Sequence, residues 1–211
     1  MTDHAHSDLA HKGDASLDRM LFFSDGVFAI AITLLSIELH PPHDWDSTFA
    51  GLIRESWPML SAFALSFLVI GVFWNAHRRL FLRMTRFTNG VFLLNLALLG
   101  GIVLMPYATT LLYQPASTVE AFAIYLGLVS VIGVLQGAIY GYAAFVADAI
   151  RPVQHWTMRL SALLMMALMP IVCCALSLAF FQRAGPVAVA GLVAVLLGLI
   201  GFRRYAARKH G

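Results

Sequence analysis

Six long apolar runs, separated by short polar segments, follow a polar start of the chain. They cover residues 20–39, 57–77, 88–112, 119–147, 158–181 and 186–202. Each run falls near the ~20 residues that an α-helix needs to cross a bilayer at 1.5 Å rise per residue. The pattern therefore predicts an all-α, polytopic membrane protein with six transmembrane helices.

Small and helix-breaking residues refine this picture. Pro58 falls near the start of the second run, where a missing backbone N–H is harmless, whereas Pro106 and Pro170 lie inside the third and fifth runs and predict kinks. In the fourth run, glycines recur every four residues, which is typical of a smooth stripe for close helix packing. These glycines are Gly133, Gly137 and Gly141.

The composition excludes an ordinary soluble domain. Of the 211 residues, 60% are hydrophobic and 12% are charged, whereas soluble domains are about 45–50% apolar and about 25% charged. No basic stretch interleaved with aromatic residues occurs, so nucleic acid is not expected as a partner. No nucleophile–base pair or phosphate-binding glycine loop is evident, so we expect neither an enzyme nor a cofactor or metal site.

The placement of the basic residues predicts the orientation. All but two of the 14 Lys and Arg residues fall in the first tail, in the segments after the second and fourth runs, or at the C-terminus; the exceptions are Arg54 and Arg183. By the positive-inside rule these segments are cytoplasmic. We therefore expect residues 1–18 to form a mobile or weakly ordered polar cytoplasmic tail, 19–204 the six-helix transmembrane domain, and 205–211 a basic cytoplasmic C-terminus.

The first apolar run contains an unusual charge. Asp25 lies inside the run, where a carboxylate costs about 2.5–3.5 kcal/mol on insertion scales and is expected to face protein partners. Arg19, His77 and Asn95 lie at matching depth. These groups fit two interpretations: a polar clamp that fixes the register of three helices, or a proton or ion site.

The same run has an apolar stripe on a different face. At about 100° per residue, Ile30, Leu34 and Ile37 fall on one side of the helix and Asp25 points elsewhere. Such a stripe is ordinarily lipid-facing or packed against another helix. Thr33 flanks it, with a hydroxyl that can face water or bond to its own helix backbone.

These residues also carry a family resemblance. Arg19-x-x-x-Phe23-Ser24-Asp25 matches the R-x-x-x-F-S-D signature of the potassium channels resembling the endolysosomal transmembrane protein 175. Trp74-x-x-His77 resembles the end of that family's second helix, and Asn95-Leu96 with Pro106-Tyr107-x-Thr109 resembles its third. The resemblance is strong over residues 19–109 and weak beyond them.

The resemblance implies a channel domain whose pore is lined by the first helix of each subunit, in a homotetramer. Carried over by position, the constriction of the pore, a hydrophobic gate, is formed by Ile30, Leu34 and Ile37, with Thr33 as a pore hydroxyl. The polar network that supports the pore helix maps onto Arg19, Phe23, Ser24, Asp25, Trp74, His77 and Asn95. No T-V-G-Y-G filter sequence occurs in the chain, so we expect modest selectivity for potassium over sodium.

Two other functions remain open from the sequence. A proton channel or proton-coupled transporter would use Asp25 and His77, and a membrane scaffold would pass no ion. We expect potassium ions, the lipid bilayer and further copies of the chain as partners. The expected location is a bacterial inner membrane, with both termini cytoplasmic.

Overall fold

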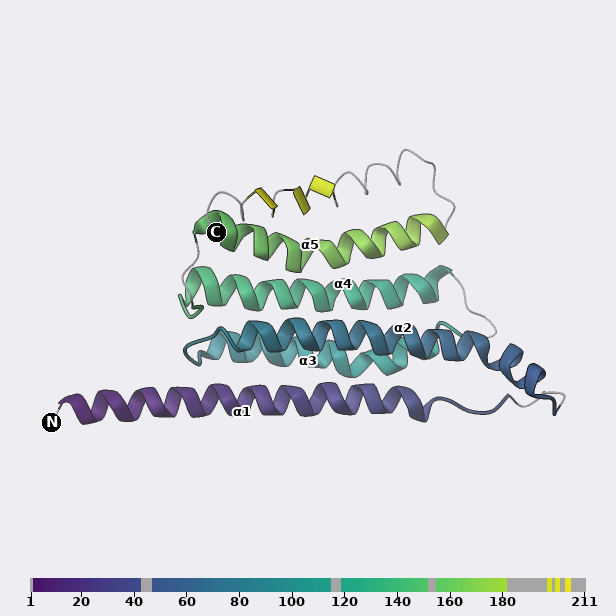
Figure 1. Cartoon of the computed structure of the whole chain (residues 1–211), viewed down its shortest axis with the longest axis horizontal. Coiled ribbons are helices and arrows are strands. Elements are labelled where there is room, and N and C mark those ends of the chain that lie inside the picture. The colour runs from purple at the N-terminus through teal and green to yellow at the C-terminus, as the bar shows by residue number, and fades with distance from the viewer. Residues whose placement is uncertain are drawn as a thin grey trace.

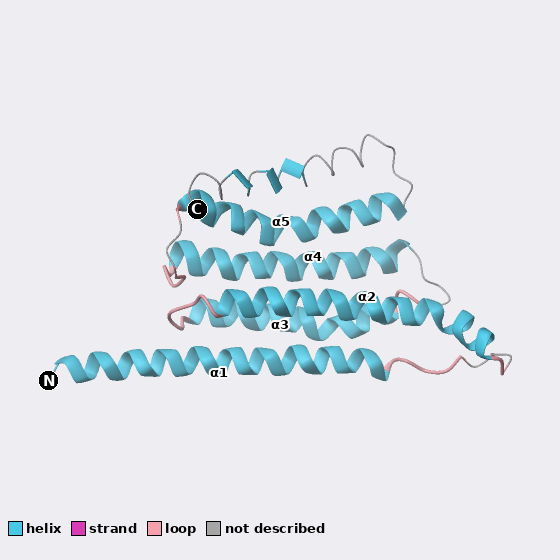
Figure 2. Ribbon diagram, viewed as in Figure 1, coloured by secondary structure: helices cyan, strands magenta, loops and turns pink. Residues whose placement is uncertain are grey.

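The computed structural model is a bundle of long helices, shown in Figures 1 and 2. It describes residues 2–42, 47–114, 119–151 and 155–181, and a few positions between 197 and 205. The helices are α1 (Thr2–Ile37), α2 (Phe49–Phe81), α3 (Asn89–Thr110), α4 (Val119–Gly141), the π-helical turn η1 (Tyr142–Val146) and α5 (Trp156–Phe181).

The long helices lie roughly parallel to one another, with α1 at one side of the bundle and α5 at the other (Figure 1). The helix α1 packs on α2 and α3, α3 packs on α4, and α4 packs on α5. In the described chain five helices are long and apolar enough to span a membrane, which makes the protein a multi-pass membrane protein. The predicted sixth helix, 186–202, lies almost entirely outside the described residues.

The predicted weakly ordered tail is instead helical. Helix α1 begins at Thr2, and its membrane-length apolar portion begins at Ala15. The tail has no proline, and residues such as Ala5, Leu9 and Ala10 favour helix, so the backbone of the apolar span continues through it. Polarity therefore marked where the apolar span begins and not where the helix begins.

Helix α2 also extends beyond its apolar run. It starts at Phe49, where the side chain of Thr48 accepts a hydrogen bond from Gly51 N at 3.0 Å. Pro58 is consequently an interior residue of the helix and not a first-turn residue, which corrects the expectation from sequence. The first turns of α2 bend away from the bundle (Figure 1), as expected where a proline removes an intrahelical hydrogen bond.

The glycine stripe of α4 is the packing face for α5. A Cβ added at Gly137 would lie 2.7 Å from Ala167 Cβ, and one at Gly133 would lie 2.6 Å from Pro170 Cγ. Real side chains do not approach so closely, so only glycine allows this helix spacing. The stripe fixes α5 on α4.

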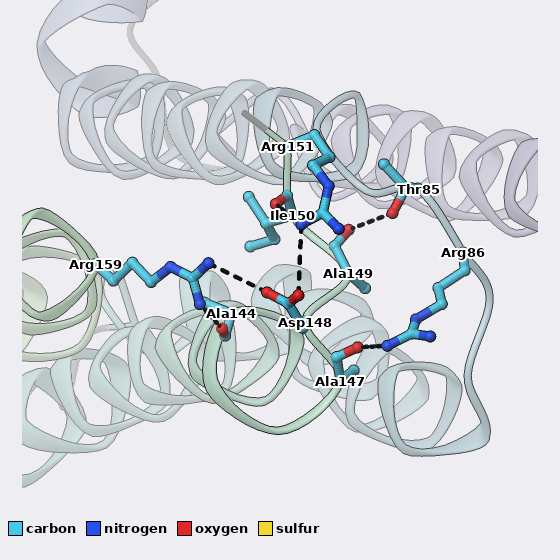
Figure 3. A network of polar contacts seen from close by, with 9 residues as sticks. All are labelled: Thr85, Arg86, Ala144, Ala147, Asp148, Ala149, Ile150, Arg151 and Arg159. Atoms are coloured by element: carbon cyan, nitrogen blue, oxygen red, sulfur yellow. Dashed lines mark hydrogen bonds and ion pairs between the residues drawn. The ribbon is translucent and has the colours of Figure 1, made fainter. Parts of the chain in front are cut away.

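Two loops are joined at one end of the bundle, as Figure 3 shows. Thr85 N donates to Ala149 O at 2.8 Å, and Arg151 N donates to Arg83 O at 2.9 Å. Asp148, at a φ of 44°, turns the chain after η1 and receives Arg159 at 3.1 Å. We call this set of contacts the loop clasp. It also contains the Asp148–Arg151 ion pair at 3.6 Å, and further side-chain bonds run from Thr85, Arg86 and Arg159 to the carbonyls of Ala149, Ala147 and Ala144. It ties the α2–α3 hairpin to the α4–α5 hairpin.

Candidate pore face and its supporting network

Helix α1 has one buried face and one exposed face. The buried positions recur every three or four residues and pack against α2 and α3; they are Leu17, Met20, Ser24, Phe28, Ala31 and Leu35. On the opposite side, the exposed fractions are 59% for Ile30, 37% for Leu34 and 67% for Ile37. The apolar stripe thus points away from the rest of its own chain, leaving it available to lipid or to other subunits.

Two further residues of α1, Thr33 and Phe23, are exposed as well. Thr33 is exposed, and its hydroxyl donates to the carbonyl of Ile30 at 2.8 Å, the local bond that threonine makes in helices. That bond leaves the oxygen lone pairs of Thr33 available on the exposed side. Phe23, from the signature, is 55% exposed and takes no part in the buried contacts of α1.

Three buried polar side chains from three helices form a chain of hydrogen bonds. Asn95 Nδ2, on α3, donates to Ser24 Oγ on α1 at 3.0 Å, and Ser24 donates to the carbonyl of Met20 at 2.8 Å. His77 Nε2, on α2, lies 2.8 Å from Asn95 Oδ1. Because Asn95 Oδ1 can only accept, His77 carries its proton on Nε2.

The ring of His77 is held by aromatic side chains. It stacks on Phe81 at 4.2 Å between ring centroids and tilts against Phe28 of α1 at 5.4 Å. The residue is fully buried, so both its ring face and its hydrogen bond fix α2 against α1 and α3. The chain of bonds runs through the amide of Asn95, which has no titratable group and orients its neighbours.

Asp25 belongs to a separate contact. Its Oδ1 accepts a hydrogen bond from Trp74 Nε1 at 2.8 Å, which ties α1 to α2 at a half-exposed site. Within the described ranges no hydrogen bond joins Asp25 to His77, and no ion pair joins it to Arg19, which is exposed. The predicted layer is therefore a buried Ser24–Asn95–His77 chain beside an Asp25–Trp74 pair.

A second buried network was missed by the sequence reasoning. Thr109 Oγ1 donates to Ser66 Oγ at 2.7 Å, and Ser66 donates to Tyr125 Oη at 3.1 Å, which joins α2, α3 and α4. All three residues are buried. The resemblance points to Thr109 alone, and the available signal for the rest was Ser66, one of two serines in the apolar run 57–77.

One known protein family matches residues 19–106 of the chain. The family model is described as the endosomal/lysosomal potassium channel TMEM175. The matched residues include the exposed stripe, the Asn95–Ser24 bond and the Asp25–Trp74 bond. A potassium channel of Streptomyces collinus is 38% identical over 46% of this chain and 47% of its own length. The chain thus spans about half the length of that relative.

Three further comparisons extend the match. A potassium channel of Chamaesiphon minutus is 35% identical over 60% of this chain and 65% of its own length. The mouse endosomal/lysosomal proton channel TMEM175 is 29% identical over 67% of this chain and 29% of its own length. A crystal structure of a lysosomal potassium-selective channel TMEM175 homolog from Chamaesiphon minutus superposes with a TM-score of 0.64 at 28% identity, over 91% of this chain and 98% of that one.

Proposed function

We propose that this chain is a member of the family of the endosomal/lysosomal potassium channel TMEM175 and forms a cation channel that passes potassium along a pore lined by α1. The potassium preference over sodium is modest, because the chain has no T-V-G-Y-G sequence to supply a ring of carbonyls that strips and replaces ion hydration. The relatives named as potassium channels support this choice of ion.

The observation that carries the proposal is the face of α1 turned away from its own chain. Ile30, Leu34 and Ile37 are exposed there, while the opposite face is fixed by the Ser24 and Asp25 contacts. A helix held on one side and bare on the other is suited to line an axis shared with further subunits. We propose a homotetramer, in which each of the three positions forms a ring of four side chains.

Such rings act as a hydrophobic gate. Branched apolar side chains that converge on an axis exclude water when they are close, and they admit hydrated ions when they move apart. Thr33 lies on the exposed side between Ile30 and Leu34 and offers its oxygen to ions at the constriction. The residues Ser24, Asp25, Trp74, His77 and Asn95 are positioning residues that hold α1; Arg19 and Phe23 flank them without a described bond to the network.

The orientation follows from the basic residues. The loop clasp carries Arg83, Arg86, Arg151 and Arg159, so we place that end of the bundle, together with both termini, in the cytoplasm of a bacterium, with the helices in its inner membrane.

The test is the reversal potential of the purified full chain in a planar bilayer, with potassium on one side and sodium on the other. A potential displaced toward the potassium equilibrium value, with unitary current steps, is expected. Absence of any ionic current under these conditions would contradict the channel assignment.

A proton pathway is the second candidate, because the mouse relative is named a proton channel. In this chain Asp25 lies on α1 and His77 packs against α1, but their described hydrogen bonds belong to separate contacts. Proton flux into vesicles under a pH gradient, abolished by Asp25→Asn, would favour this candidate. Potassium current that survives in Asp25→Asn would favour the first.

A further inference from the structure

A large cavity lies on the side of the bundle away from α1. It has a volume of about 680 Å³, within the range of small-molecule sites, and it lies between α2 and α5 over α4. Its walls are apolar, and four methionines of α5 line it. These are Met158, Met165, Met166 and Met169. Methionine side chains adapt to flexible apolar ligands, which suits this wall to an acyl chain.

Two polar side chains line the same cavity with unused hydrogen-bonding groups. Gln136 of α4 is only 2% exposed, and among the described residues neither its Oε1 nor its Nε2 has a hydrogen-bond partner. Arg83 also lines the cavity, and its buried Nη2 has no partner in the same ranges. Buried groups of this kind destabilise the protein when they are left unpaired, so they indicate a ligand that pairs with them.

The two groups set the chemistry of the ligand. A guanidinium is a cation with donors only, and it favours a phosphate or carboxylate. The Gln136 amide both donates and accepts, and it suits the ester or hydroxyl groups just below a charged head. The nearest ion pairs do not neutralise Arg83, because Asp148 of the loop clasp pairs with Arg151 and Arg159. Basic pockets between membrane helices are a recurrent form of site for anionic lipid headgroups.

We propose that this cavity binds an anionic phospholipid, with its phosphate at Arg83, its glycerol region at Gln136 and an acyl chain along the α5 methionines. The site is separate from the pore face of α1 and does not depend on the proposed conduction. The backbone carbonyl of Arg83 accepts a hydrogen bond from Arg151 N in the loop clasp. A lipid bound to the Arg83 side chain therefore connects the loop clasp with the cavity between α2 and α5.

The experiment is native mass spectrometry of the full chain, delipidated in detergent and titrated with phosphatidylglycerol, phosphatidylcholine or inorganic phosphate, together with the thermal shift that each produces. Phosphatidylglycerol is expected to remain bound and to raise the melting temperature, and phosphatidylcholine to bind at least tenfold more weakly. Equal retention of the two lipids, or an equal shift with inorganic phosphate alone, would overturn the assignment.

Matched variants locate the site. Arg83→Gln is expected to weaken phosphatidylglycerol binding at least tenfold, Arg83→Lys to retain most of it, and Arg79→Gln, an exposed arginine of α2 outside the cavity, to leave it unchanged. Gln136→Leu, which replaces the buried amide by an apolar side chain of similar size, is expected to weaken binding without unfolding the protein. Wild-type retention in both Arg83→Gln and Gln136→Leu would place the lipid elsewhere and reject the proposal.

Discussion

Among individual side chains, Ile30 is the most informative for the proposed pore. It is exposed on α1 beside the Thr33 hydroxyl, and it lies one turn beyond Gly26, whose neighbourhood holds no described atom within 4 Å of an added Cβ. The rest of the described chain covers less than half of the Ile30 side chain, so most of this apolar surface is free to meet another subunit or lipid. A ring of four such residues would set the width and wetting of the narrowest layer.

Ile30→Asn is therefore expected to raise unitary conductance and to lower the preference for potassium, because an amide ring stays hydrated. The measurement is single-channel current with mixed potassium and sodium. Ile124→Asn is the control, since Ile124 on α4 has a similar exposed fraction of 56% against 59% for Ile30. Equal currents in Ile30→Asn and wild type would remove Ile30 from the pore.

Asn95 is the central link of the buried chain of hydrogen bonds. Asn95→Leu removes the acceptor of His77 Nε2, a buried group that costs about 1–3 kcal/mol when unpaired, and also removes the donor to Ser24 Oγ, which keeps only its bond to Met20 O. We expect a lower melting temperature of the detergent-solubilised protein, whereas Asn89→Leu, at an exposed position of α3, should change stability by less than about 0.5 kcal/mol. Equal melting temperatures for the two variants would show that the chain of bonds contributes little.

The Asp25–Trp74 bond can be tested by a double-mutant cycle. Asp25→Asn and Trp74→Phe each weaken the same contact, so the double variant should lose less stability than the two single variants added together, with a coupling of about 0.5–3 kcal/mol. The measurement is the free energy of unfolding in denaturant. Strict additivity would mean that the contact is not formed in the membrane protein.

These residues also mark what sequence can reveal about a site. The phase of α1 separates Asp25 from the Ile30 stripe without any structure, because helical spacing is fixed. The partners of Asp25 could not be assigned this way, since Arg19, His77 and Asn95 all lie at compatible depth. Only the packed arrangement shows Trp74 on Asp25 and Ser24 on Asn95.

Helices α4 and α5 show how backbone proximity determines pairing. Gly137 meets the backbone of Ala167 as well as its Cβ, with an added Cβ at 3.0 Å from Cα and 3.1 Å from N, so the neighbour cannot move aside by rotating a side chain. Glycine spacing in the sequence predicted a packing face. The spacing could not predict which helix packs on the glycine face of α4, because several apolar runs of the chain offer a compatible surface.

Gly137→Ala is expected to push α5 off α4 and to destabilise the protein, by about 1–3 kcal/mol as for other overpacked sites. Gly127→Ala on the same helix meets no described atom within 4 Å and gains helix propensity, so it should be neutral or stabilising. Thermal unfolding of both variants in one detergent decides between them. A neutral Gly137→Ala would show that the helices are further apart than described.

Helix boundaries were the least predictable feature among the elements. Hydropathy reports which residues suit a bilayer, whereas α1 and α2 extend past their apolar runs into polar sequence that is still favourable to helix. The order of the five membrane-length helices in the described residues follows from the apolar runs, because the hydrocarbon thickness sets a length that turns and loops do not reach. The caps and the π-helical turn depend on local bonds that hydropathy does not register.

Across the chain as a whole, the loop clasp joins the two hairpins through hydrogen bonds to backbone carbonyls, and ion pairs of Asp148 brace its α4–α5 side. The hydrogen bond from Arg159, and then the charges of Arg151 and Arg159, hold the pKa of Asp148 below its ordinary value of 3.8. A carboxyl with a lowered pKa stabilises the folded state fully above its ordinary pKa, and the effect is lost as pH falls through the lowered value. Because Asp148 is exposed, salt weakens the effect.

Asp148→Asn is accordingly expected to lower the melting temperature at neutral pH and low salt, and the difference from wild type should shrink as the pH falls below 3.8 or as salt is added. Asp18→Asn, an exposed carboxylate on α1, provides the control. A difference that stays constant from neutral to strongly acidic pH would mean that Asp148 acts through the shape of its turn and not through its charge.

The loop clasp leaves α1 outside the braced part of the molecule. Helices α2 to α5 are cross-tied at one end, so they form a frame, and α1 is attached to that frame only along its buried face. A rotation of α1 that withdrew Ile30 from the axis would carry Ser24 off Asn95 and Asp25 off Trp74 together. In the proposed channel, opening by this rotation therefore breaks both contacts in the same movement, so a variant that weakens either contact should raise the open probability.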